Sequence, residues 1–580
     1  MNGDFPGSQR GFSWNGKTLL SGIDPAGRAE RVAEAIPVMD RTLYLCPSPL
    51  YGYGLEHLLA RIAPFSNSAV LCIEAEPDLF ALSQKHFGAT LRNNQKLRLT
   101  NHCKPEMLCT LLRREWGPRF FRRVEMIRLN GGWQLHSALY DMLEESLRRE
   151  IALDWGNAMT LTKLGRRYIR NALRNLALIP RCPSLQRLSF GSAPVLVLGA
   201  GPSLDQTLDG LQARFGGALS SPERRPFRII CVDTCLPALK ERNITPDLAV
   251  ILESQHWNLA DFTGLSGWNV SAAFDLSALP GSASVLAGRL FLFFTPWTEL
   301  NIFERLKTAG LLPASLPPLG SVGLSAAIIA RHLTRGPIIT AGLDFSFTLD
   351  SYHARSTPGH KEKLRRQNRF LGLFNVEAVF GRAVFAAVSK NGHRVFSNPA
   401  LRNYRDLFQR EFGGADVPVF FDIAAGSNAA GSNAASTAAA NGLPLGIETL
   451  SPDAAFDVLA VDDCLAAGSP PELPCADNAG LAEKLRAFIR DEQNRLITLR
   501  DMLTGKTAMD NDTLVTLVDE CDYLWAHFPD YAAADRRPGK MAAAGSGASI
   551  SFLKRLRVEI DPFLKLWELT LHTGHFSYYN

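Results

Sequence analysis

The sequence predicts an α/β fold: an N-terminal Rossmann-like domain, a central doubly wound parallel sheet and a C-terminal helical region. Short apolar runs of strand length alternate with amphipathic helical stretches, a pattern typical of parallel sheets covered by helices on both faces. Apolar residues make up 46% of the 580 residues and charged residues 21%, so the chain can bury a large core. About three or four units of ordinary domain size are expected.

The first unit is expected to span residues 1–190, as a Rossmann-like domain with a helical connector. Strands are predicted over 41–46 and 69–74, with a helix over 51–62 between them. Glu74 ends the second strand, as acids do in nucleotide-binding halves. The turn after the first strand has two prolines and lacks the glycines of a phosphate loop. A ligand-binding domain and a scaffold domain both fit this pattern.

The central unit, expected over residues 191–423, has strands that end in glycine or acidic residues. Ligands of parallel α/β sheets bind at the carboxyl ends of the strands, so a functional site is expected along that edge. The predicted elements are strands over 195–198, 229–232, 247–252, 290–294 and 338–342, and a helix over 321–333.

The remaining chain is predicted to be a linker followed by helices. Residues 424–442 are expected to be a flexible Ala/Gly/Ser/Asn linker or loop, because the repeat AAGSNAAGSNAAS offers no bulky side chains to a core. Residues 443–580 are expected to be mostly helical. Amphipathic helices are predicted over 478–503, 513–527 and 550–571.

Composition disfavours several classes of protein. The net charge of +5 is small and dispersed, which argues against nucleic acid as a partner. No apolar run reaches the roughly 18 residues of a membrane span, and the N-terminus lacks a secretory signal. Ten cysteines without a CxxC pair favour a reducing cytoplasm over disulfides or a zinc site. Walker, HExxH, GxSxG and kinase signatures are absent from the sequence.

A glycine-rich turn after the strand over 195–198 is the first candidate site. Glycines let a backbone approach an anion, and the N-terminus of the following helix offers free N–H groups. A tight turn with a capping serine explains the same letters. The residues predicted to contact a phosphate or nucleotide are Gly199, Ala200, Gly201, Pro202, Ser203 and Leu204.

Further candidates follow other strands and open a helix. Asp233 and Glu253 end successive strands, where a carboxylate binds ribose hydroxyls or a metal, and each equally suits a helix cap. Thr234 belongs to the same loop as Asp233, whereas Asp247 follows a proline and is expected to be structural. Ser321 opens the helix over 321–333, either as a second anion contact or as a plain N-cap.

The loop after the strand over 338–342 carries the candidate catalytic residues. Gly342 and Asp344 lie where this strand reaches the expected cleft, and Tyr352 and His353 lie on the loop beyond them. Histidine titrates near neutrality and can act as a general base. We therefore predict His353 as the base, with Tyr352 and Asp344 beside it.

Together these motifs resemble the MptE-like domain. The residues that carry the resemblance are VLVLGAGPSLD at 195–205, Asp233, Pro246-Asp247, GSV at 320–322 and GLDF followed by YH at 342–353. The domain occurs in 6-hydroxymethylpterin diphosphokinase and in motility accessory factors (Maf), which are flagellin glycosyltransferases. NGKTLLSGIDP at 15–25 and IEAEPDLF at 73–80 resemble the longer members. Cys46 and Ser48 stand where relatives tend to have glycines, and Glu253 stands where Asp is more usual.

The resemblance implies a fold related to bacterial sialyltransferases, a CMP-activated nonulosonic acid as donor and flagellin Ser or Thr as acceptor. The turn at 199–204 would hold the nucleotide phosphate and Asp233 the nucleoside or sugar hydroxyls, while His353 would accept the acceptor's proton. An alternative is a diphosphokinase that moves pyrophosphate from ATP to a pterin, with Mg²⁺ held by Asp233 and Glu253. A non-catalytic flagellin-binding scaffold is the third possibility. No cofactor is certain beyond the CMP-sugar co-substrate, and Mg²⁺ stays open.

Overall fold

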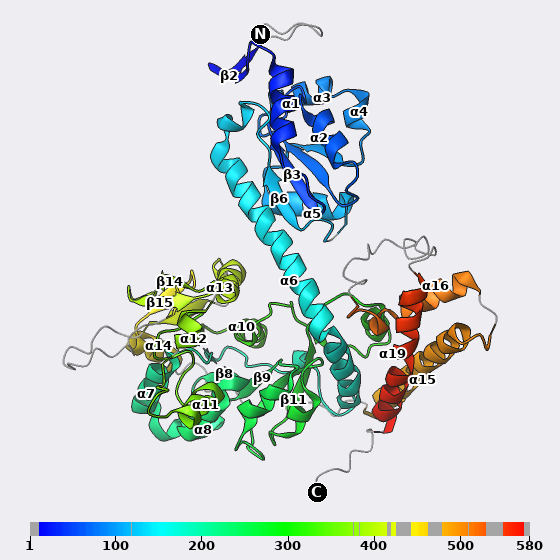
Figure 1. Cartoon of the computed structure of the whole chain (residues 1–580). Helices are drawn as coiled ribbons and strands as arrows, with labels where there is room; N and C mark the ends of the chain where they lie inside the picture. The colour runs from blue at the N-terminus through cyan, green and yellow to red at the C-terminus, as the bar shows by residue number, and fades with distance from the viewer. Residues whose placement is uncertain are drawn as a thin grey trace. The chain divides into compact units, whose positions relative to one another are not determined.

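The computed structural model describes residues 11–117, 119–374, 376–381, 383–414, 419–424, 442–461, 478–507, 510–528 and 549–572. The chain divides into two compact units (Figure 1), one of residues 1–165 with 525–552 and one of residues 166–524 with 553–580. Apart from Ala424 and Gly442, the predicted linker lies outside the described residues. The predicted α/β fold with two parallel sheets and C-terminal helices is confirmed.

The first unit is built on a four-stranded parallel sheet with the order β5-β4-β3-β6. The helix predicted over 51–62 begins only at Leu55, because hydrogen-bonded turns hold residues 49–55. A hairpin of β1 (Phe12–Trp14) and β2 (Lys17–Leu20) precedes the sheet and was not predicted. The other elements are β3 (Thr42–Pro47), β4 (Ala69–Ile73), β5 (Leu97–Thr100), β6 (Arg123–Met126), α1 (Pro25–Ala35), α2 (Leu55–Ile62), α3 (Pro77–His86), α4 (Ala89–Arg92) and α5 (Pro105–Glu115).

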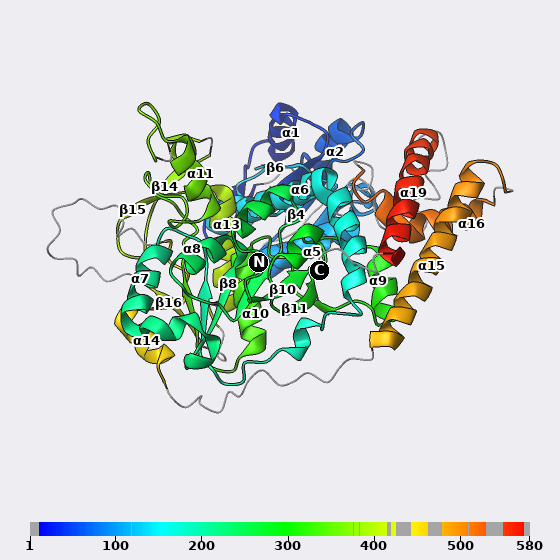
Figure 2. The same cartoon turned by 90° about the horizontal axis from the view of Figure 1, so that it is seen from below.

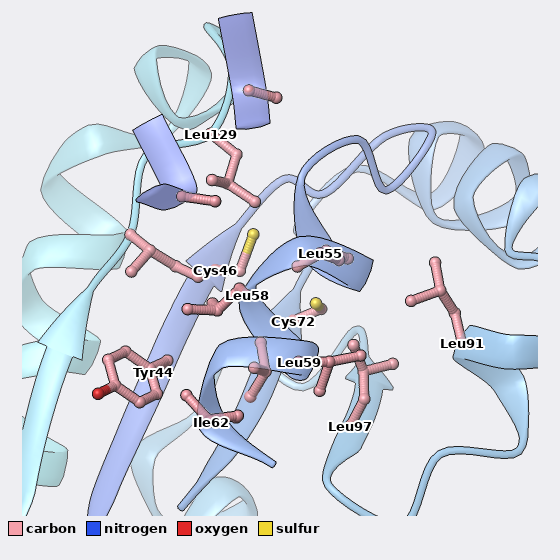
Figure 3. Packing of buried hydrophobic residues seen from close by; sticks show 14 of the residues in the cluster. Tyr44, Cys46, Leu55, Leu58, Leu59, Ile62, Cys72, Leu91, Leu97 and Leu129 are labelled. Carbon is pink, nitrogen blue, oxygen red and sulfur yellow. The ribbon is translucent and has the colours of Figure 1, made fainter. Parts of the chain in front are cut away.

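Both faces of this sheet are buried. Tyr44 and Cys46 of β3 pack into one apolar cluster with the residues of α2 (Figure 3), whereas Leu43 and Leu45 pack into another on the opposite face. Alternate residues of one strand therefore face two cores, as expected of a parallel sheet between helical layers. This explains why β3 and β4 are apolar without alternation.

The second unit is built on a nine-stranded parallel sheet with the order β12-β11-β10-β9-β8-β7-β13-β16-β17. Five of its strands were predicted; β10, β12, β16 and β17 were not. The bounds are β7 (Val195–Leu198), β8 (Arg228–Val232), β9 (Leu248–Ile251), β10 (Ser271–Asp275), β11 (Leu290–Phe294), β12 (Ala314–Ser315), β13 (Ile338–Ala341), β16 (Phe420–Ile423) and β17 (Glu448–Leu450).

Helices cover this sheet and continue beyond it. The helix α10 packs on β7, β8, β9 and β13, and most of its side chains are buried. A separate hairpin pairs β14 (Phe385–Val388) with β15 (Arg394–Ser397). The helices are α7 (Leu204–Phe215), α8 (Leu236–Glu241), α9 (Asn301–Thr308), α10 (Val322–Leu333), α11 (Pro358–Arg366), α12 (Val376–Val379), α13 (Pro399–Phe412) and α14 (Pro452–Leu459).

The long α6 (Ser137–Asn175) runs from the first unit into the second as one helix. Near the C-terminus, α15 (Asn478–Leu503), α16 (Asn511–Glu520) and α19 (Ser549–His572) lie side by side (Figures 1 and 2). The helix predicted over 513–527 ends at Glu520, where a buried 3-10 turn over Asp522–Leu524 follows. Among the described residues, none of the helices is long and apolar enough to cross a membrane.

Candidate functional site

The strand order of the nine-stranded sheet reverses between β7 and β13. From β7 the strands follow in order to β12 on one side, while β13 lies on the other side of β7. Ligands of open α/β sheets bind at such a switch point, outside the carboxyl ends of the strands. The two loops that leave β7 and β13 are the turn at 199–204 and the Gly342 loop, both predicted as site elements.

Direct backbone hydrogen bonds join these two loops. The N–H of Gly199 donates to Ala341 O and that of Gly201 to Gly342 O, both at 2.8 Å. A Cβ on Gly201 would lie 2.5 Å from Oδ2 of Asp344, and Gly342 has a φ of +70°. Glycine is therefore required at both positions for the two loops to meet.

The carboxylate of Asp344 lies at the N-terminus of α7. It is buried and accepts hydrogen bonds from Ser203 N at 2.7 Å and Ser203 Oγ at 2.6 Å. The positive end of a helix favours an anion, and here the protein supplies its own. A ligand phosphate must therefore contact the turn beside this carboxylate or displace it. The backbone N–H of Leu204 donates to Gly201 O, and Pro202 has no N–H to offer.

The imidazole of His353 lies beside the same turn. Its Nδ1 is 3.3 Å from Ala200 O, and the following N–H, of Ala354, also donates to Ala200 O at 3.0 Å. Because a carbonyl oxygen only accepts, Nδ1 carries the proton and Nε2 keeps its lone pair. Burial lowers the pKa of His353 and outweighs the opposing effect of the Ala200 hydrogen bond. The ring is therefore neutral at pH 7 and can act as a base.

Two more predicted residues lie next to this group. The ring of Tyr352 is 5.0 Å from that of His353 and stacks on Phe347 at 4.8 Å. Burial raises the pKa of Tyr352, so its hydroxyl stays a donor at neutral pH. Ser321 precedes the first turn of α10, and its side chain makes no cap hydrogen bond. In that turn the backbone at Gly323 packs directly against the side chain of Leu343, the residue that follows Gly342.

A second polar group gathers beyond β8 and β9. Asp233 is buried and accepts hydrogen bonds from Thr234 N at 2.9 Å and Asn258 Nδ2 at 2.8 Å. The same Asn258 Nδ2 lies 3.1 Å from Oδ2 of Asp261. One amide therefore donates to two carboxyl groups that would otherwise repel each other. Glu253 lies in the preceding loop, where its Oε1 accepts from Gln255 N at 2.9 Å.

These carboxyl groups bind protons unusually tightly. Burial raises the pKa of Asp233 to about 6, and burial together with the charge of Asp233 raises the pKa of Asp261 to about 7. Because the two carboxyl groups interact, these pKa values describe the titration of the pair and not of either residue alone. The Oδ1 atom of Asn258 is buried and has no hydrogen-bond partner in the described part of the chain. A ligand hydroxyl or amino group would satisfy it.

Asn258 and Asp261 were missed from the sequence. They lie on a 3-10 helix over His256–Phe262, where residues three apart share a face. The i, i+3 spacing of an amide and an acid directly after the strand-end Glu253 was the available signal. Its meaning depends on the neighbouring loop that presents Asp233, which is distant in the sequence.

The carboxyl pair predicts a distinctive dependence of stability on pH. A folded pKa above the ordinary Asp value means that the folded protein holds the proton more tightly, so this stabilisation is complete below about pH 4 and is lost as the pH rises through 6–7. Between pH 5 and 8, we expect the free energy of unfolding of the parent to fall by about 2 kcal/mol more than that of Asp261→Asn. Urea unfolding at each pH measures this difference. The exposed Asp457→Asn should keep the parent's pH dependence. Equal pH slopes in the parent and Asp261→Asn would contradict the shared protonation.

The described residues contain no group of three or more His, Cys, Asp or Glu side chains that could hold a metal ion. Asp233 already accepts hydrogen bonds from Thr234 and Asn258, and its raised pKa means that a metal ion would compete with a proton for this carboxylate at mildly acidic pH.

At the corresponding edge of the first unit, polar side chains already form hydrogen bonds within the protein. Ser48 stands at the end of β3 and donates through Oγ to Oε2 of the buried Glu74 at 2.7 Å. Asn130 donates to Ser48 O at 2.8 Å. Glu74, which stands where the ribose-binding acid of a nucleotide-binding half would stand, therefore already bonds to a side chain of the protein.

Comparison with known proteins agrees with this architecture. Residues 168–350 match the family model described as "6-hydroxymethylpterin diphosphokinase MptE-like". An uncharacterized protein of Treponema pallidum (strain Nichols) is 29% identical over 569 residues, which is 96% of this chain and 94% of that protein. The solved "Structure of MAf glycosyltransferase from Magnetospirillum magneticum AMB-1" has a TM-score of 0.54 and 14% identity, covering 98% of this chain and 91% of that one. The resemblance to the MptE-like domain is therefore confirmed over residues 168–350. The fold of nearly the whole chain is similar to that of the Maf glycosyltransferase structure.

Proposed function

We propose that this protein is a cytoplasmic glycosyltransferase of the motility accessory factor type. Its donor would be a CMP-activated nonulosonic acid and its acceptor a Ser or Thr hydroxyl of flagellin. The observation that carries the proposal is the neutral His353 at the β7–β13 switch point, with Nδ1 engaged by Ala200 O and Nε2 left as a base. The fold similarity to the Maf glycosyltransferase supports the choice of reaction.

The reaction needs one bond to break, one to form and one proton to move. The bond between the anomeric carbon and the phosphate oxygen breaks, and CMP leaves with the electron pair. The acceptor oxygen bonds to that carbon, and its proton moves to Nε2 of His353. The ring of Tyr352 lies beside that of His353, so its hydroxyl would donate to the leaving phosphate. The N–H groups of Gly199, Gly201 and Ser203 already donate within the protein, so the turn at 199–204 would contact the phosphate only after rearrangement. Asp344 acts as a positioning residue because it fixes Ser203 and the turn.

The acidic group beyond β8 suits the sugar or nucleoside part of the donor. The unpartnered Oδ1 of Asn258 accepts a hydroxyl or amino hydrogen, and the oxygens of Asp233 and Asp261 lie within hydrogen-bond distance of the same amide. Hydroxyl-rich ligands bring donors to such acceptors.

The surface beyond His353 suits a macromolecular acceptor rather than a pterin. The helix α11 begins five residues after His353 and carries Lys361, Lys363, Arg365 and Arg366. Beyond it, Phe370 is 93% exposed and Phe374 is 59% exposed. Exposed aromatic and basic side chains in one segment are typical of a protein-binding surface.

Nucleotide binding separates this function from its alternatives. In calorimetry with CMP, CDP, ATP and GTP, we expect the cytidine nucleotides to bind and Asn258→Ala to weaken them about tenfold, since a hydrogen bond to a buried group is lost. Asn94→Ala makes the same chemical change in the first unit and should leave binding unchanged.

The other outcomes point to other functions. ATP binding without a response to cytidine nucleotides would favour pyrophosphoryl transfer by a diphosphokinase. A folded protein that binds none of the four would favour a non-catalytic, flagellin-binding scaffold.

A further inference from the structure

A cavity of about 310 Å³ lies at the amino edge of the nine-stranded sheet. Arg289 lines it directly before β11, and Pro313 lines it directly before β12. The connector after α6 forms another wall, held to β11 by the hydrogen bond from Leu292 N to Pro183 O at 2.8 Å. The carboxyl ends of the strands, where the proposed transferase site lies, are on the opposite edge of the sheet. The cavity is thus separate from that site.

Positive charge dominates the rim of this cavity. Three arginines line it, Arg181, Arg187 and Arg289, and none of the lining residues that the structure describes is acidic. Within the described residues, Arg187 and Arg289 form no ion pair with any carboxylate. A cleft with one sign of charge and low-dielectric walls concentrates its field on a ligand of opposite sign.

Cys182 lines the cavity together with these arginines. The charges of Arg181 and Arg289 both act on its thiol and favour its ionised form. Burial outweighs them and raises the pKa of Cys182 to about 11, so the thiol is neutral and does not cancel their charge. The walls behind it are apolar, and consist of Ile179, Leu292, Leu311, Leu312 and Leu481.

We propose that this cavity is a second binding site, which takes a phosphate monoester carrying an apolar body. A monoester has close to two negative charges at neutral pH and three acceptor oxygens, which suits two or three guanidinium forks better than a single carboxylate does. The apolar walls accommodate the ester group. The volume lies at the lower end of small-molecule pockets, so the ligand is small. This site does not depend on the proposed transferase activity.

Phenyl phosphate is the probe that tests this site. Calorimetry with the full-length protein should detect its binding, with inorganic phosphate and phenol each binding at least tenfold more weakly because each lacks half of the recognised groups. Arg187→Gln and Arg289→Gln should each weaken phenyl phosphate about tenfold, since each removes a charged hydrogen bond. Arg224→Gln, an exposed arginine outside the cavity, should leave it unchanged. Binding should also persist at saturating CMP.

Four results would overturn the proposal. They are no binding of phenyl phosphate at millimolar concentration, unchanged affinity in both arginine variants, equal affinity for phenol, or complete displacement by CMP, which would assign the probe to the opposite edge. Circular dichroism of each variant shows whether it is folded. The test does not depend on a single variant, because Arg187 and Arg289 are both exposed and lie in different segments of the chain.

Discussion

Replacing Asp247 by Ala is expected to lower the free energy of unfolding of the second unit by about 3–5 kcal/mol. Asp247 precedes β9, and its carboxylate accepts from Arg225 Nη2 at 2.7 Å, Arg228 Nη1 at 3.1 Å and Ile229 N at 2.7 Å. The side chain of Arg225 is 0% exposed and that of Asp247 is 7% exposed. Removing the carboxylate would leave a guanidinium buried without its counter-charge, which is the costly outcome for a buried ion pair.

A matched series separates this effect from the loss of an ordinary salt bridge. Asp209→Ala removes a carboxylate that is 61% exposed and pairs with Arg242 at 3.4 Å, and it should cost less than about 1 kcal/mol. The double variant Arg225→Met with Asp247→Asn should recover much of the loss, because the fully buried Arg225 charge is gone and Asn still accepts from Ile229 N. Only the partly exposed Arg228 loses its carboxylate. Urea unfolding followed by circular dichroism measures all three. An Asp247→Ala midpoint equal to that of Asp209→Ala would show that the pair contributes no more than a surface contact.

The strands that the sequence predicted are those with strong local signals. The strands β7, β8, β9, β11 and β13 are apolar runs, and most of them end at glycine or an acid, so composition alone located them within one or two residues. The strands β12 and β17 have two and three residues, too few for periodicity to show. The order of the sheet is set by long-range pairing, so the position of β13 beside β7 could not be derived from local pattern.

The candidate site was predicted in the same uneven way. Glycine and strand-end position located the turn at 199–204 and the loop after β13, which the structure brings together. The partner of Ser203 could not be foreseen, because Asp344 lies 141 residues further along the chain. Ser203 was expected to cap α7 or to bind phosphate, yet its hydroxyl donates to Asp344 and makes no cap hydrogen bond. An isolated strand-end acid does not reveal whether it serves a ligand or a neighbouring helix.

The largest effect on turnover is expected at His353. A positioned general base contributes about a hundredfold to ten-thousandfold in rate, so His353→Asn should lose at least a hundredfold in sugar transfer. Asn can still donate a hydrogen bond toward Ala200 O but cannot accept a proton near pH 7. Affinity for CMP should change little, because the imidazole acts on the acceptor hydroxyl. His332→Asn, the same substitution on the surface at the far end of α10, should keep full activity.

The pH profile of the parent tests the same role independently of any substitution. Because burial lowers the pKa of His353, the imidazole stays neutral and competent as a base below the ordinary histidine value of about 6.5. The acid limb of kcat/KM, which reports the free enzyme, should therefore fall below pH 6.5. Lys363→Gln removes a positive charge that acts on His353, so it should move this limb to higher pH while kcat at its optimum stays near the parent's. A limb that stays in place in Lys363→Gln, together with near-parent transfer by His353→Asn, would exclude His353 as the base. The candidates would then be the acids at this edge: Asp344, Glu253, Asp233 and Asp261.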